Sequence, residues 1–212
     1  MVRRLFLVPI AILVATASVS AQQTTGWQYG GRVSWVNAAA EAELGDTGNE
    51  LALRSGPGFE FDAGLMFSDR FGVELSAGVS THELHATGTW GEINGGRVWL
   101  VPLTAIAQYH QPVYGPWDPY VGLGIAWTLP LYDLSADLSD AGVERLEIDA
   151  SVSLAAQLGV NYQLDNRWYA NIDLSYMGTS LEARARTEDG DLPPATLDIT
   201  PFAISLGVGY RF

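Results

Sequence analysis

The last eleven residues, 202–212, alternate strictly between apolar side chains and small or polar ones. In steps of two from the C-terminus, Phe212, Tyr210, Val208, Leu206, Ile204 and Phe202 are apolar, and Arg211, Gly209, Gly207, Ser205 and Ala203 are small or polar. Because successive side chains of a β-strand point to opposite faces, this segment predicts a strand with one apolar and one polar face. Aromatic residues at both ends of the apolar face are typical of a strand that closes a bacterial outer-membrane barrel.

Seven earlier segments repeat this alternation: 27–35, 59–67, 71–79, 99–109, 121–129, 152–162 and 168–176. With the last segment they predict eight strands, and an even number is expected of bacterial outer-membrane barrels. Short turns alternate with long polar connections, which run roughly over 37–56, 82–97, 133–149 and 187–196. We therefore predict an all-β fold: an eight-stranded antiparallel transmembrane β-barrel with short periplasmic turns and four long extracellular loops.

The positions of the aromatic residues separate this prediction from a soluble barrel with an apolar interior. One set falls at the short-turn end of the apolar face: Trp27, Phe67, Phe71, Tyr109, Tyr162, Trp168, Tyr210 and Phe212. A second set falls at the other end: Trp35, Phe59, Trp99, Trp127, Tyr176 and Phe202. Each set would form a belt of aromatic residues around the barrel, here called an aromatic ring. Two such belts at fixed heights are typical of strands that cross a bilayer.

Residues 1–21 have the features of a cleaved secretory signal peptide. Arg3 and Arg4 precede an apolar run, and small residues at 19–21 provide a cleavage site before Gln22. Residues 22–212 then form a single barrel domain, and we expect it to be an integral protein of the outer membrane of a Gram-negative-type bacterium.

Charge and composition exclude several classes of function. Without Arg3 and Arg4, 9 arginines face 24 acidic residues, which gives a formal charge of −15 and argues against binding of nucleic acid. The chain has no cysteine, so thiol chemistry is excluded. His82 and His85 lack the spacing of a metal site, and we predict no metal and no cofactor. The acidic loops are expected to be solvated and to contact lipopolysaccharide, in part through divalent ions.

The polar face of the strands is predicted to point into the barrel. At mid-height and below it carries an interior polar network: Arg32, Glu60, Asp62, Glu74, Asp173 and Arg211. Charges shielded from lipid usually pair with one another, so we interpret this network as a structural plug. Glycines recur on the same face, among them Gly30, Gly64, Gly207 and Gly209, and they are expected to leave room for a cavity.

The outer end of the predicted interior is apolar. Its lining is expected to comprise Val36, Leu100, Pro102, Pro130, Met177 and Leu197. An apolar pocket above a polar plug would suit a small hydrophobic ligand that arrives from outside the cell. The alternative is ordinary packing of strand ends that extend beyond the bilayer.

Several short motifs together resemble the OmpW family of small outer-membrane barrels. They are Trp27-Gln28, Thr81-His82, Pro119 to Ile125, Gln157 to Tyr162, Asp165-Asn166 with Trp168, and Gly207 to Phe212. The resemblance covers the whole mature chain and implies a hydrophobic channel or pocket for the passage of small hydrophobic molecules across the outer membrane. The fourth strand departs from the family's double-proline pattern, with Val101-Pro102-Leu103.

We therefore expect a barrel with an outward-opening apolar pocket that binds and admits small hydrophobic molecules. The alternative function is that of a structural or adhesive barrel of the OmpA type, with a plugged interior and function in its loops. The C-terminal Phe212 is expected to be recognised by the outer-membrane assembly machinery. Ser80 and His82 share a strand face but have no evident third partner, so we predict no enzymatic activity.

Overall fold

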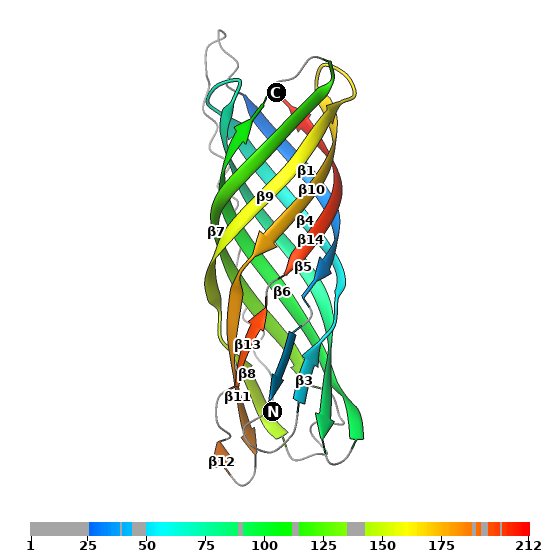
Figure 1. The fold of residues 1–212 in the computed structure, drawn as a ribbon, viewed down its shortest axis with the longest axis vertical. Coiled ribbons are helices and arrows are strands. Elements are labelled where there is room, and N and C mark those ends of the chain that lie inside the picture. The colour runs from blue at the N-terminus through cyan, green and yellow to red at the C-terminus, as the bar shows by residue number, and fades with distance from the viewer. Residues whose placement is uncertain are drawn as a thin grey trace, which may run out of the picture.

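The computed structural model describes residues 26–38, 40–43, 50–88, 91–111, 115–134, 143–187, 190–191, 195–199 and 201–212. The signal peptide predicted for residues 1–21 lies outside these ranges. Eight long strands, tilted relative to the barrel axis, form a barrel (Figure 1): β1 (Trp27–Asn37), β4 (Gly56–Met66), β5 (Phe71–Gly88), β6 (Gly91–His110), β7 (Trp117–Leu134), β9 (Ser151–Gln163), β10 (Trp168–Met177) and β14 (Phe202–Arg211). This arrangement confirms the predicted all-β fold.

Antiparallel pairing closes the barrel completely. Each long strand pairs with the next long strand along the chain, and the first strand, β1, pairs with the last, β14. The register between them runs from Gln28 opposite Arg211 to Asn37 opposite Phe202. Closure leaves no free strand edge in the membrane. An unpaired backbone amide or carbonyl there would cost roughly several kcal/mol, because no water is present to form a hydrogen bond with it.

Short turns connect the strands at the end that holds the C-terminus, the upper end in Figure 1. In the turn between β9 and β10, Asp165 Oδ1 accepts hydrogen bonds from the backbone amides of Arg167 at 2.7 Å and Trp168 at 2.8 Å. These hydrogen bonds, first that from Trp168 and then that from Arg167, lower the pKa of the Asp165 carboxyl. Aspartate is favoured here because its short side chain can cap the turn's free amides.

At the opposite end the barrel wall continues far beyond the membrane. The described parts of the long connections are largely strand: β2 (Ala40–Glu43), β3 (Glu50–Leu53), β8 (Val143–Ile148), β11 (Thr179–Thr187), β12 (Gly190–Asp191) and β13 (Ala195–Ile199). β2 and β3 extend the main sheet beside β5, whereas β8, β11, β12 and β13 form a second sheet. Some of these segments alternate, as Ala40–Glu43 and Ala195–Ile199 do, but most are short and several are rich in alanine and glutamate, which are depleted in strands.

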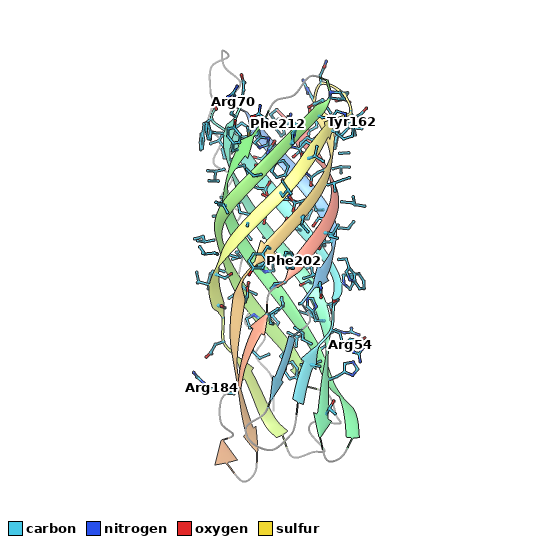
Figure 2. All side chains as sticks on the ribbon, viewed as in Figure 1. Arg54, Arg70, Tyr162, Arg184, Phe202 and Phe212 are labelled. Carbon is cyan, nitrogen blue, oxygen red and sulfur yellow. The ribbon has the colours of Figure 1, made fainter. Side chains whose placement is uncertain are left out.

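The apolar face of the barrel points outward, as predicted. Phe61, Leu123, Leu154 and Ile204 are exposed between the two aromatic rings. Figure 2 shows Tyr162 and Phe212 at the short-turn end and Phe202 near mid-height of the whole molecule, with Arg54 and Arg184 beyond it. The described residues contain no helix that is long and apolar enough to cross a membrane.

Candidate functional site in the barrel interior

Arg32 is the centre of a buried charge cluster at mid-height of the membrane barrel. Its guanidinium lies 3.0 Å from a Glu60 oxygen, 3.2 Å from Asp62, 2.5 Å from Glu74 and 3.9 Å from Asp173. Five of the six residues predicted for the interior network thus meet at one point. Four strands supply them, since Glu60 and Asp62 are both on β4.

Arg211, the sixth predicted residue, belongs to a second cluster at the periplasmic rim. Its guanidinium donates to Asp118 at 2.7 Å and to Gln163 at 3.1 Å, and it lies over the ring of Tyr169. Asp118 also binds His110 Nδ1 at 3.0 Å. The sequence prediction missed Asp118 and His110, because both lie at a strand end where the alternation gives a weak signal.

Two hydrogen-bonded chains connect the central cluster with the rim. One runs from Asp173 through Tyr120, Asn171 and Asn161 to Asp118, with donor–acceptor distances of 2.8, 3.0, 2.8 and 3.3 Å. The other runs from Glu74 through Gln108 and His110 to Asp118, with distances of 2.9, 3.2 and 3.0 Å. The periplasmic half therefore contains a continuous polar network, and a space of about 260 Å³ lies among its residues. Its role as a plug stays a prediction.

Some inward glycines accommodate large neighbours and so leave no cavity, whereas Gly30 and Gly78 do line internal spaces, as expected. The Tyr169 ring lies over Gly209, its partner in the register of β10 and β14, and a Cβ at Gly209 would meet the ring at 2.1 Å. Tyr120 covers Gly159 in the same way, across β7 and β9. Each of these two glycines makes room for an aromatic side chain on the adjacent strand, and the pair together fills the narrow interior.

A cavity lies on the outer side of the Arg32 cluster. It holds about 590 Å³ of empty space, which includes the part open to solvent. Its lining alternates with residues of the outer aromatic ring: Leu100 follows Trp99, Met177 follows Tyr176, and Ala203 follows Phe202. The cavity is therefore at the height of the outer set of aromatic residues, where the barrel is expected to cross the extracellular surface of the membrane.

Four of the six residues predicted to line a pocket do line this cavity: Val36, Leu100, Pro102 and Met177. Pro130 is half-buried and is not among the lining residues. Leu197 lies in β13, opposite Leu181, rather than on the last membrane strand. The nearby Ile199, which is 1% exposed, lines the cavity together with Pro201. The chain leaves the strand alternation between β13 and β14, so counting back from the C-terminus did not place these residues.

An apolar cap packs inside the wall at the outer end of the cavity and beyond it, and Val36, Leu100, Ile199 and Ala203 belong to both. Its buried members are Val36, Ala38, Leu53, Leu84, Val98, Leu100, Ile199 and Ala203, and Tyr132 and Ile148 pack against them. The cap contains residues of both the main sheet and the second sheet. It therefore gives the extracellular wall a hydrophobic core of its own.

Ser80 lines the cavity, and His82 contacts Ser80 from behind the lining. His82 Nε2 is 2.8 Å from Ser80 Oγ, and His82 Nδ1 is 2.9 Å from the backbone oxygen of Arg54. Both ring nitrogens are thus occupied, and the position that a catalytic carboxylate would take is held by a backbone carbonyl. Among the described residues no group of His, Asp or Glu is arranged to hold a metal ion.

Comparison with known proteins places this barrel in a family. The family model for the OmpW family matches residues 33–212. The chain belongs to the OmpW family. It is 30% identical to outer membrane protein W of Vibrio cholerae over 79% of both chains. It is also 23% identical, over 94% of this chain and 95% of the relative, to the dibenzothiophene metabolism operon protein DoxH of a Pseudomonas species.

Solved structures support the same fold. The crystal structure of the outer membrane protein OprG from Pseudomonas aeruginosa aligns with a TM-score of 0.81, over 91% of this chain and 98% of that chain. Sequence identity between the two is 22%. Outer membrane protein W and OprG are outer-membrane proteins, and this OmpW-family barrel is likewise an integral protein of the outer membrane.

Proposed function

We propose that this OmpW-family barrel binds small hydrophobic molecules in the cavity at the outer membrane interface and admits them to the membrane. The observation that carries the proposal is the position of this cavity between an apolar cap and a polar plug. Ligand sites are usually concave and mostly apolar, with a few polar groups that fix orientation, and the lining here has that composition.

The polar plug bears on the direction of transfer. A hydrophobic molecule that continued toward the periplasm would have to leave apolar contacts and separate Arg32 from four carboxylates. Breaking buried ion pairs is expensive, on the order of 3–5 kcal/mol. Sideways exit from the cavity into the bilayer avoids this cost, and we include it in the proposal. The name of the relative DoxH refers to the metabolism of dibenzothiophene, which is an apolar aromatic compound, and this agrees with the proposed cargo.

Binding of a small apolar fluorescent probe tests the proposal directly. The purified barrel in lipid nanodiscs is compared with a double variant, Leu100→Glu with Met177→Glu, in which two carboxylates enter the cavity. We expect saturable binding by the wild type and its loss in the double variant, because charged groups remove the favourable transfer of apolar surface, about 25 cal/mol per Å².

The matched control carries Val36→Leu, which keeps the lining apolar and should retain probe binding. The heat-shifted mobility of each variant on a gel shows whether the barrel is folded. Failure of the folded wild type to bind any apolar probe would contradict the proposal and would favour a structural or adhesive role carried by the extracellular segments.

The route is tested separately in vesicles that contain the wild-type barrel. A small neutral sugar should not permeate, since the polar plug closes the periplasmic half, while an apolar compound should still enter the bilayer faster than in empty vesicles. Rapid sugar permeation would indicate a continuous channel and would refute sideways exit while leaving the binding site intact.

A further inference from the structure

Glu60 is the acid of the Arg32 cluster that opens toward the cavity. Its side chain is 26% exposed, whereas those of Asp62, Glu74 and Asp173 are 5%, 6% and 3% exposed. Glu60 lines the cavity, while the other three do not. One carboxylate oxygen lies 3.0 Å from Arg32 Nε, and the other accepts a hydrogen bond from Ser76 at 2.9 Å. The carboxylate is therefore held in place at the floor of an otherwise apolar space.

Beneath the cavity, acidic groups outnumber the basic group by four to one. Arg32 carries one positive charge, and the four acids that surround it carry four negative charges when ionised. The second described arginine of the interior, Arg211, is paired with Asp118 at the rim. In surroundings of low polarity, an excess of one sign acts strongly on a charged group placed nearby. The floor of the cavity therefore attracts a cation and repels an anion.

Hydroxyl groups line the cavity from its floor, where Ser34 and Ser205 are opposite each other and Ser205 is also opposite Asp173, to its outer part, where Ser80 is opposite Leu100 and Thr179 is opposite Ile199. Six serine and threonine residues line the cavity: Ser34, Ser80, Thr128, Ser175, Thr179 and Ser205. Apolar residues dominate the outer part, among them Leu100, Met177 and Ile199. Such a gradient fits a molecule with two ends, because its apolar end and its polar end would each meet a wall of its own kind.

We infer that the cavity selects small amphiphiles whose polar end is a cation or a neutral hydrogen-bond donor, directed at Glu60, and that it discriminates against carboxylates. This inference rests on the proposed function and assigns it a substrate class. A protonated primary amine is the best-matched head group, an alcohol is intermediate, and a fatty-acid carboxylate is the worst. Glu60 is then a specificity-determining residue rather than only a member of the plug.

Competition at neutral pH measures this ranking. Octylamine, octanol and octanoate are used to displace the bound apolar probe from the barrel in nanodiscs, and empty nanodiscs correct for partitioning into lipid. Primary amines have pKa values near 10, so octylamine is a cation in this experiment, roughly as lysine is. We expect octylamine to displace the probe at a concentration about tenfold or more below that of octanoate, with octanol between them.

The chain supplies a matched pair of variants. Glu60→Gln and Asp62→Asn each remove one negative charge beside Arg32, but only Glu60 lines the cavity. We expect Glu60→Gln to reduce the preference for amine over carboxylate to about threefold or less, and Asp62→Asn to retain most of it. Heat-shifted gel mobility again establishes that both variants are folded.

The outcomes separate the two proposals. If the probe binds the wild type but octanoate displaces it as well as octylamine does, the substrate class is wrong while the proposed function stands. Equal losses of preference in the two variants would also overturn the role of Glu60, since a general change of charge would explain them. If the folded wild type does not bind the probe at all, both the proposed function and this inference fail. The wild-type ranking alone decides the substrate class even where a variant does not fold.

Discussion

The two halves of the barrel interior are built on the same eight strands, yet the periplasmic half is largely filled by polar side chains around a space of about 260 Å³, and the outer half holds a larger cavity of about 590 Å³. In the periplasmic half, large side chains face glycines on the adjacent strand, as Tyr169 faces Gly209. At the level of the cavity, small residues face small residues: Ser34 is opposite both Ser205 and Gly58. Pairing of large with small residues helps to close the periplasmic half, and the pairing of Ser34 with small residues leaves space at the cavity. The register between neighbouring strands therefore decides where a ligand can enter.

The largest expected effect comes from removing the charge at the centre of the filled half. Arg32→Met leaves three buried acids, Asp62, Glu74 and Asp173, and the half-buried Glu60 without their common partner. Loss of one member of a buried ion cluster typically costs about 3–5 kcal/mol, so we expect the free energy of unfolding to fall by about 4 kcal/mol. Urea unfolding in lipid vesicles, followed by tryptophan fluorescence, measures this change.

The control for Arg32 is Arg167→Met in a periplasmic turn. Arg167 is exposed and donates to the hydroxyl of Tyr210 at 2.6 Å. An exposed pair of this kind contributes little to stability, so this variant should unfold close to the wild type. Equal stability of both variants and the wild type would show that the central cluster is not what holds the filled half together.

The sequence was sufficient to predict the strands, their orientation and most of the charged cluster. Alternation with a period of two places Arg32, Glu60 and Asp173 on the inner face without knowledge of their neighbours. It does not specify which inward residue faces which across a strand pair. The match of Tyr169 with Gly209 depends on a register between strands, and a shift by a single residue would move every side chain to the other face. For this reason Gly209 and Gly159, which lie under tyrosine rings, were wrongly expected to leave empty space.

The apolar cap was hidden for a different reason. Leu53, Leu84 and Val98 lie in or beside segments that are polar overall, and no membrane requires their outer face to be apolar there. Only the inward face of these strands is then apolar, so the alternation is weaker. Short strands such as β3, with four residues, give too few positions to show it. Ile199 lies next to a break in the strands, where alternation cannot be followed. Contacts between distant segments, rather than local pattern, create this core.

The cap should be separable from the membrane barrel. Leu84 is 2% exposed within the cap, and truncation of a buried leucine typically costs 2–5 kcal/mol. We expect Leu84→Ala to destabilise the extracellular wall by about 3 kcal/mol while the membrane part stays folded. Hydrogen exchange of residues 81–98 should accelerate, and the heat-shifted gel mobility should not change.

Leu123→Ala is the matched control for the cap, because Leu123 is 72% exposed on the lipid-facing side. It removes the same atoms without opening a space in the interior. Leu84→Ala could instead lower the free energy of unfolding of the whole barrel and leave hydrogen exchange of residues 81–98 unchanged. The cap and the membrane barrel would then unfold as a single cooperative unit.

A smaller change tests the register rule itself. Gly209→Ala places a Cβ 2.1 Å from the Tyr169 ring, whereas Gly31→Ala, on the outer face of a neighbouring strand, meets no atom closer than 3.8 Å. Overpacking of this kind costs about 1–3 kcal/mol, so we expect a loss of about 2 kcal/mol for Gly209→Ala and almost none for Gly31→Ala in urea unfolding.

A double-mutant cycle then identifies the cause of that loss. If the fit between ring and glycine is responsible, Gly209→Ala should cost far less in a Tyr169→Ala background than in the wild type, because the ring that it displaces is gone. Equal costs in the two backgrounds would place the strain in the backbone of β14 instead. In that case the filled half would owe its closure to strand geometry, and the pairing of large with small residues would be its consequence rather than its origin.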